Sequence, residues 1–240
     1  MKAAALALLT LGLAAPMPTN AQSTVDRVDV ALVLAVDVSG SVDDNRFSLQ
    51  MEGIARAFED REVQSTILSG QYGALLVTLV NWSQKPQIAV PWRVIASAAD
   101  AMAFAADVRR APRRAEDFTC MSQMMQVVGD KVLPLMPVPA DRMLVDVSGD
   151  GRDNCNPLTA VDSVRDGLVA DRVTINGLPI RAGREAETIA PWYQQHVIGG
   201  AAAFLLPANG YTDFGRAIRQ KFIIEISGQQ PRFASSLASR

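Results

Sequence analysis

The chain has 240 residues, of which 49% are hydrophobic and 20% charged, so it can bury one substantial core without repeats or disulfides. Its 23 basic and 25 acidic residues give a formal net charge of −2. This balance excludes a strongly basic nucleic-acid-binding protein and indicates one globular domain.

The first 21 residues have the layout of a secretory signal peptide. Lys2 precedes an apolar run over residues 3–15, and two prolines and the small residue Ala21 follow it. The run is too short for a lasting membrane anchor, and no later segment is apolar enough to span a bilayer. We therefore expect an exported protein, periplasmic or secreted, that begins near Gln22. A buried N-terminal helix is the alternative.

The remaining chain alternates strand patterns with helix patterns. Residues 28–36 form a continuous apolar run, typical of a strand buried on both faces, and a helical apolar stripe follows over residues 47–58. Strands are next expected at residues 74–82 and 87–92, the latter with prolines that suit a sheet edge. Further helices are expected at residues 97–110, 119–136, 157–170, 186–195 and 213–226, and further strands at residues 142–151, 172–180 and 201–208.

This alternation predicts an α/β fold, with a doubly wound, mostly parallel sheet and helices on both faces. We expect the domain to cover residues 22–227, followed by a loose tail over residues 228–240. Ligands of such folds bind beyond the carboxyl ends of the strands. Asp37 and Asp150 both lie at predicted strand ends and should therefore share one rim.

Polar residues alternate where the chain leaves the first strand, in the order Asp37, Ser39 and Ser41. A loop with this D-x-S-x-S pattern can turn three oxygen-bearing side chains towards one point, and oxygen ligands suit a hard divalent cation such as Mg²⁺. Ser41 or Asp43 can instead cap the following helix. Thr119, which opens a predicted helix, and Asp150 are the other two candidate ligands.

The order and setting of these residues resemble the metal-ion-dependent adhesion site of a von Willebrand factor A domain. The stretches "VLAVDVSGSV", "VTLVNWS", "VPWRVI", "MLVDVSGDGRDN", "VTINGLPI", "VIGGAAAFLL" and "DFGRAIRQKFIIEIS" resemble, in the same order, the exported bacterial domain-of-unknown-function 1194 family. The resemblance extends over residues 28–227.

The resemblance implies a ligand set and a partner. Ser39, Ser41 and Thr119 would offer hydroxyls to a cation, Mg²⁺ or else Mn²⁺ or Ca²⁺, while Asp37 and Asp150 supply charge. An acidic side chain of a partner protein would complete the coordination. The implied function is metal-dependent protein binding, without catalysis, nucleic acid or a membrane span.

Several alternatives stay open at this stage. Thr119 can be a plain helix cap, and the site can belong to a structural or assembly domain that binds no metal. A Mg²⁺-dependent phosphohydrolase would carry its nucleophile at Asp37, but its second carboxylate would stand where this chain has Ser39. In an oxidising compartment Cys120 and Cys155 can form a disulfide that ties the threonine loop to the aspartate loop.

Other polar residues receive structural interpretations. Asp43 is expected to be a solvated first-turn acid, and Asp153 and Asn154 to form a turn. His196, the one histidine, has no partner suggested by the sequence and is expected to be structural.

Overall fold

The structure is a computed structural model that describes residues 25–155 and 160–228. The predicted signal peptide and all but the first residue of the predicted tail lie outside these residues, so both remain predictions.

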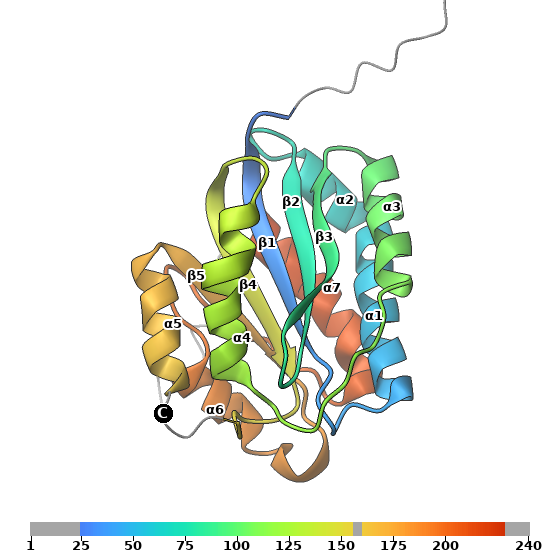
Figure 1. The fold of residues 1–240 in the computed structure, drawn as a ribbon. Coiled ribbons are helices and arrows are strands. Elements are labelled where there is room, and N and C mark those ends of the chain that lie inside the picture. Colours follow the sequence, from blue (N-terminus) through green and yellow to red (C-terminus); the bar gives the residue numbers. More distant parts are fainter. Residues whose placement is uncertain (1–24, 156–159, 229–240) are drawn as a thin grey trace, which may run out of the picture.

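A five-stranded sheet in the order β3-β2-β1-β4-β5 forms the centre of the molecule (Figure 1). The strands are β1 (Val28–Asp37), β2 (Leu75–Trp82), β3 (Gln87–Ile95), β4 (Ala140–Gly149) and β5 (Val173–Pro179). All neighbouring strands pair in parallel except β3, which is antiparallel to β2 at the sheet edge. This confirms the predicted fold class and the edge position of the proline-bearing strand.

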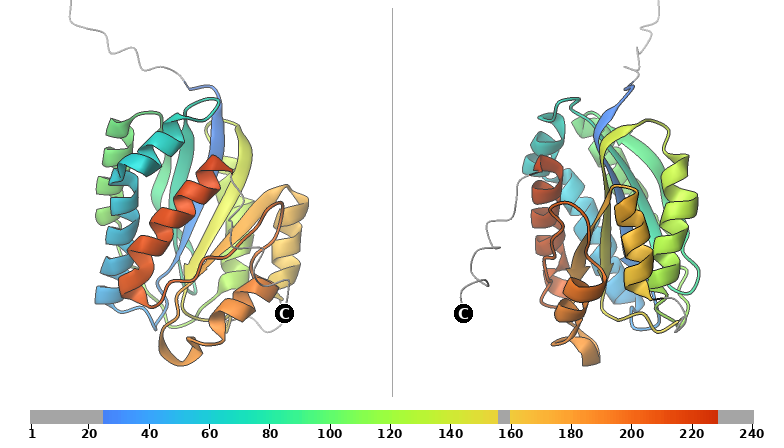
Figure 2. Two further views of the ribbon diagram at one scale, coloured as in Figure 1. Left: turned by 180° about the vertical axis from the view of Figure 1, so that it is seen from behind. Right: turned by 90° about the vertical axis from the view of Figure 1, so that its left-hand side faces the viewer.

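Helices cover both faces of the sheet (Figure 2). One layer contains α1 (Asp44–Glu59), α2 (Arg61–Leu68), α3 (Ala98–Arg109) and α7 (Phe214–Ser227), and the other contains α4 (Met121–Val127), α5 (Val161–Ala170) and α6 (Ile189–His196). Successive residues of β1 serve the two layers in turn: Leu32 and Leu34 pack under the first, Val33 and Ala35 under the second. Burial on both faces explains the unbroken apolar run.

Two predicted elements differ in the structure. The helix expected over residues 119–136 is α4 followed by a π turn and a 3₁₀ turn that contains Pro134. Residues 201–208 run beside β5 but form only isolated bridges to it rather than a strand. The N–H groups of Leu206 and Ala208 donate to the carbonyl oxygens of Gly177 and Pro179, but Pro179 has no N–H to donate in return, which interrupts the ladder between these segments.

The carboxyl ends of the parallel strands lie together at the lower edge of Figure 1. Val36 pairs with Ser148, so β1 and β4 end at the same level. The chain leaves β1 at Asp37 and β4 at Gly149, and the two following loops therefore emerge side by side. This register brings Asp37 and Asp150 to one rim.

A buried charged cluster joins α7 to the sheet, and nothing in the sequence pattern predicted it. The Nζ of Lys221 lies 3.1 Å from Oδ1 of Asp146 in β4 and also contacts Oε1 of Glu225. Asn176 of β5 donates a hydrogen bond of 2.7 Å to the same glutamate oxygen. Burial raises the pKa of Asp146 to about 7, because it outweighs the attraction of the ammonium group.

Replacing Asp146 with asparagine is expected to flatten the dependence of stability on pH. The folded protein keeps a proton on Asp146 that the unfolded chain releases near pH 4, so the contribution of Asp146 to the free energy of unfolding falls as the pH rises from about 4 to about 7. The limiting slope is about 1.4 kcal/mol per pH unit. Urea denaturation across this range measures it. Asp141→Asn, on the exposed ion pair with Arg27, is the control; equal slopes in both variants would contradict the assignment to Asp146.

Candidate metal centre

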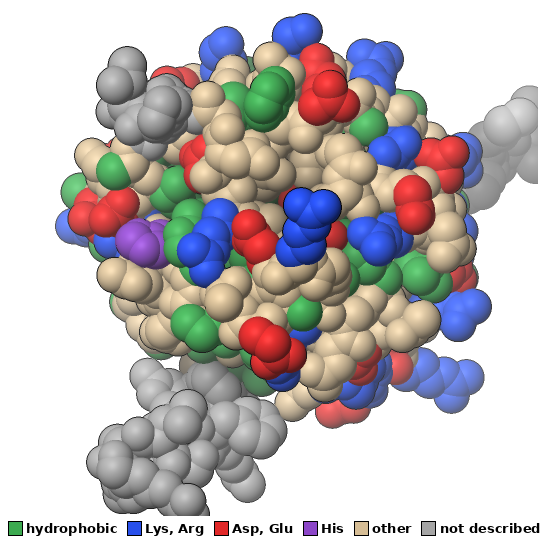
Figure 3. All heavy atoms as spheres, turned by 90° about the horizontal axis from the view of Figure 1, so that it is seen from below, with side chains coloured by type: hydrophobic (Ala, Val, Ile, Leu, Met, Phe, Trp, Pro, Cys, Tyr) green, Lys and Arg blue, Asp and Glu red, His purple; other side chains and the backbone are tan. Residues whose placement is uncertain are grey.

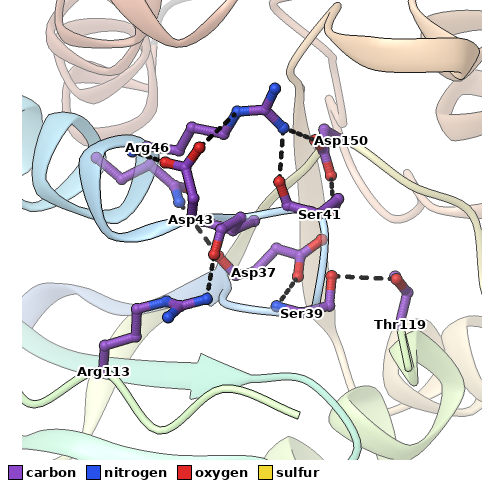
Figure 4. Close-up of polar contacts among 10 residues, drawn as sticks. Asp37, Ser39, Ser41, Asp43, Arg46, Arg113, Thr119 and Asp150 are labelled. Carbon is purple, nitrogen blue, oxygen red and sulfur yellow. Dashed lines mark hydrogen bonds and ion pairs between the residues drawn. The ribbon is translucent and has the colours of Figure 1, made fainter. Parts of the chain in front are cut away.

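Asp37 is fully buried where β1 ends, and its backbone and side chain are both held in place (Figure 4). Its Oδ1 accepts a hydrogen bond of 2.8 Å from the backbone N–H of Ser39. Its carbonyl oxygen accepts one of 3.1 Å from Nε2 of Gln50 in α1. These contacts turn the chain away from the sheet and present the two serines of the D-x-S-x-S segment.

Two hydroxyl contacts bring the distant candidate residues together. Ser41 Oγ donates a hydrogen bond of 2.6 Å to Oδ1 of Asp150. Thr119 Oγ1 donates one of 3.2 Å to Ser39 Oγ. Figure 4 shows these side chains converging from three loops that follow β1, precede α4 and follow β4. The structure thus assembles all five sequence-predicted residues at one rim.

Asp37 has one carboxylate oxygen without a partner. Its Oδ2 is buried and receives no hydrogen bond. Burial raises the pKa of the carboxyl to about 7, although the Ser39 hydrogen bonds oppose this shift. Gly149 leaves room here, because a Cβ at that position would come within 2.8 Å of Oδ2. A buried carboxylate oxygen facing hydroxyl groups needs a proton or a cation.

The donor chemistry fits a hard divalent cation. The site offers two carboxylates and three hydroxyls, the oxygen ligands that Mg²⁺ prefers. Within residues 25–155 and 160–228, no three or more His, Cys, Asp or Glu side chains are arranged to hold a metal ion. Hydroxyl groups must therefore supply part of any coordination at this rim.

The loop that carries Thr119 is fastened to the loop after Asp150. A disulfide joins Cys120 to Cys155, as the sequence analysis expected for an exported chain. Asn154 Oδ1 accepts a hydrogen bond of 2.8 Å from the Thr119 N–H, and the Asn154 N–H donates one of 3.0 Å to the Thr119 carbonyl. Thr119 is thereby fixed beside Ser39.

Thr119 is not the N-cap of α4, which was the structural alternative. Cys120 occupies the N-cap position without a side-chain bond. Asp153 Oδ2 instead accepts a hydrogen bond of 2.7 Å from the Ser122 N–H in the first turn. Asp153 and Asn154 were expected from the sequence to form only a turn. In the structure they also join the loop after β4 to the segment around Thr119. Their place beside Cys155 was the available signal.

Asp43 and His196 both have structural partners outside the set of candidate ligands. Asp43 is the N-cap of α1 and accepts a hydrogen bond of 2.8 Å from the Arg46 N–H. His196 Nδ1 lies 3.9 Å from Asp162 Oδ2, and its ring centroid lies 5.4 Å from that of Trp192. These neighbours belong to α5 and α6, and neither is among the five candidate ligands, which is consistent with a structural histidine.

A hollow of about 450 Å³ opens beside the candidate ligands. It is lined in part by Ser41, Arg46, Thr119, Asp150, Arg152 and Glu185. Figure 3 views this end of the molecule and shows acidic and basic side chains close together across the face. The hollow gives a charged group of another molecule access to the site, since Ser41 lies at the surface.

The strand order and the solved structures it resembles show that the chain has the fold of a von Willebrand factor A-like domain. The chain belongs to the family described as "Protein of unknown function (DUF1194)", whose model matches residues 27–230. Both findings confirm the resemblance drawn from the sequence. No curated protein sequence matches this chain.

Solved structures with this fold come from distant proteins. Proximal thread matrix protein 1 of the mussel byssus, in a structure with a zinc-occupied MIDAS motif, has a TM-score of 0.60 at 12% identity. The alignment covers 83% of this chain and 46% of the mussel chain, so this chain spans less than half of that protein. A von Willebrand factor type A protein from Catenulispora acidiphila has a TM-score of 0.57 at 14% identity, covering 83% and 43%.

The vWF domain of the type V pili tip protein Mfa5 from Porphyromonas gingivalis is covered almost entirely. Its TM-score is 0.55 at 9% identity, with 83% of this chain and 96% of that chain aligned. At such identities the similarity shows the fold alone. In the two described ranges of this chain, no helix has the length and apolar character needed to cross a bilayer.

Proposed function

We propose that this protein is an exported, metal-dependent protein-binding module. Ser39, Ser41 and Thr119 would hold a divalent cation through their hydroxyls, and Asp37 and Asp150 would balance its charge directly or through water. The bound cation supplies a Lewis-acidic position that a carboxylate can occupy. The partner would provide that carboxylate from an aspartate or glutamate.

The observation that carries the proposal is the convergence of five oxygen-bearing side chains around an unpartnered buried carboxylate oxygen. A contact of 3.2 Å joins the hydroxyls of Thr119 and Ser39, and one of 2.6 Å joins the Ser41 hydroxyl to Asp150, which supports a site shared by three loops. Oδ2 of Asp37 receives no hydrogen bond in the described chain and therefore needs a proton or a cation. A cation there would satisfy this oxygen and the surrounding lone pairs together.

A binding role explains the arrangement better than a phosphohydrolase role does. Such an enzyme needs a second carboxylate two residues after the nucleophile to act as acid and base. Ser39 occupies that position, and its hydroxyl is engaged with Thr119. The proteins of similar fold include a thread matrix protein of the mussel byssus and a type V pili tip protein, and neither name describes an enzyme, which supports the choice of binding. The Cys120–Cys155 disulfide supports an oxidising compartment.

Mg²⁺ or Mn²⁺ is expected to stabilise the wild-type protein and not the Asp37→Ala, Asp150→Ala double variant. A ligand that binds only the folded state adds about 2.7 kcal/mol when its concentration is one hundred times its Kd. Thermal unfolding of chelator-treated protein, titrated with each ion, measures this effect. The variant loses both charged ligands and should show no increase in Tm.

Asp44→Ala is the matched control, because Asp44 lies beside the site segment with a 93% exposed side chain. It should retain the full response to the ion. If neither Mg²⁺ nor Mn²⁺ raised the Tm of the wild-type protein, the result would favour a structural or assembly domain that binds no metal. Affinity capture from the native cell envelope, with and without chelator, would then identify the partner of a responsive protein.

A further inference from the structure

The guanidinium group of Arg46 lies directly over the candidate metal site. Its Nη1 donates a hydrogen bond of 2.5 Å to the carbonyl oxygen of Ser41. The same nitrogen lies 3.6 Å from Oδ2 of Asp150. Arg46 therefore contacts two of the five candidate ligand residues, although it was not predicted from the sequence (Figure 4).

Neighbours outside the ligand set hold this side chain in place. The guanidinium carbon lies 5.1 Å from the centre of the Tyr211 ring, and Nε lies 3.7 Å from Oδ2 of Asp43. The Arg46 side chain is 34% exposed and lines the hollow beside the site. A cationic group that is pre-positioned in this way and accessible from solvent can bind a carboxylate at little entropic cost.

The Asp150 carboxylate contacts one hydroxyl group and one cationic group. Oδ1 accepts the Ser41 hydroxyl and Oδ2 faces Arg46, so the guanidinium is its only cationic neighbour in the described chain. A divalent cation held by Asp150 would repel the guanidinium and weaken this ion pair. The donors of Arg46 that face the site would then be available to another anion.

We propose that Arg46 is a second carboxylate-binding group, which neutralises Asp150 when no cation is bound and shares the partner's carboxylate with the cation when one is. This inference rests on the proposed function and adds to it the residue that selects an acidic side chain over a neutral oxygen ligand. It also couples the two binding events. Cation binding releases the guanidinium that the partner needs, and Arg46 competes with the cation in the absence of the partner.

The inference predicts effects of opposite sign in one variant. Arg46→Gln should bind Mg²⁺ roughly fivefold more tightly, since the positive charge beside Asp150 that repels the cation is gone. The same variant should bind a carboxylate probe roughly tenfold more weakly, the size of a lost charge-assisted hydrogen bond. Misfolding cannot produce this combination, because it would weaken both affinities.

The probes are Mg²⁺ alone, measured by calorimetry, and the tripeptide N-acetyl-glycyl-aspartyl-glycine amide, titrated into Mg²⁺-saturated protein and followed by NMR. The asparaginyl counterpart of the peptide tests selectivity, which Arg46→Gln should largely remove. Arg46→Lys keeps the charge and should leave Mg²⁺ affinity near that of the wild type. Arg56→Gln should match the wild type in every measurement, because Arg56 lies on the same helix but is 75% exposed and pairs with Glu52, outside the site.

Different outcomes would refute the proposed function and the role of Arg46. No Mg²⁺ binding by the wild type, or peptide binding that survives a chelator, would refute the proposed function and this inference with it. Normal Mg²⁺ binding together with unchanged peptide affinity and selectivity in Arg46→Gln would overturn the role of Arg46 alone.

Discussion

Replacing Lys221 with methionine is expected to lower the free energy of unfolding by about 3–5 kcal/mol at neutral pH, the cost of breaking a buried ion pair from one side. The Lys221 side chain is 0% exposed and carries the one ammonium group between Asp146 and Glu225. Its Nζ also lies 4.9 Å from the centre of the Phe204 ring. Without it, Glu225 and the ionised fraction of Asp146 lose the ammonium group that both contact.

The size of the effect follows from burial. Methionine can fill much of the space of the lysine stem, so the loss arises mainly from uncompensated charge rather than from a cavity. Urea denaturation at neutral pH measures the change. A triple variant that also carries Asp146→Asn and Glu225→Gln removes the uncompensated charges. It should recover a substantial part of the free energy of unfolding that Lys221→Met loses.

Lys85→Met provides the control for this experiment. Lys85 lies 3.1 Å from Glu116 in an ion pair, but its side chain is 72% exposed, so its replacement should cost less than about 1 kcal/mol. If Lys221→Met were no more destabilising than this control, the cluster would not be an ionic contact. The pairing of α7 with the sheet would then rest on apolar packing alone.

Replacing both Cys120 and Cys155 with serine is expected to cost about 2–4 kcal/mol and to weaken Mg²⁺ binding. The disulfide closes a loop between residues 35 apart in the sequence and fixes the segment that carries Thr119. Without it, the Thr119 loop depends on its hydrogen bonds to Asn154 and on the cap that Asp153 gives Ser122. Part of the cation's binding energy would then go into ordering Thr119.

Reduction of the wild-type protein should reproduce both effects, and this comparison controls for the serine side chains. Thermal unfolding gives the stability change, and calorimetry with Mg²⁺ gives the affinity. Peptide mapping without reductant checks that the bond is present in the starting material. Unchanged stability and Mg²⁺ affinity after complete reduction would show that the hydrogen bonds hold the Thr119 loop without help.

Local sequence patterns predicted most of the helices and strands, because the buried faces of these elements require apolar residues at regular spacing. Residues 28–36 are apolar throughout since both faces of β1 are covered, and apolar residues of α1 recur at helical spacing because one side packs on the sheet. The D-x-S-x-S segment was recognisable because its polar residues directly follow the apolar run of β1, where a buried polar side chain needs a partner.

Contacts between distant segments required the tertiary structure. Arg46 and Asp150 meet because β1 and β4 end at the same level, and Lys221 meets Asp146 because α7 crosses β4 on one face. The members of these two pairs lie 104 and 75 residues apart in the sequence, on different elements. Local sequence patterns carry no information about contacts over such separations.

The sequence by itself determined the order of strands and helices and the residues offered to a cation, since these follow from hydrophobicity and side-chain chemistry. Only the tertiary structure decided that Arg46 lies against Asp150, that Asp153 and Asn154 hold the segment around Thr119, and that Lys221 of α7 is buried against the sheet. The physical reason is that strand register and helix packing, which are cooperative properties of the whole domain, set which polar groups must compensate one another.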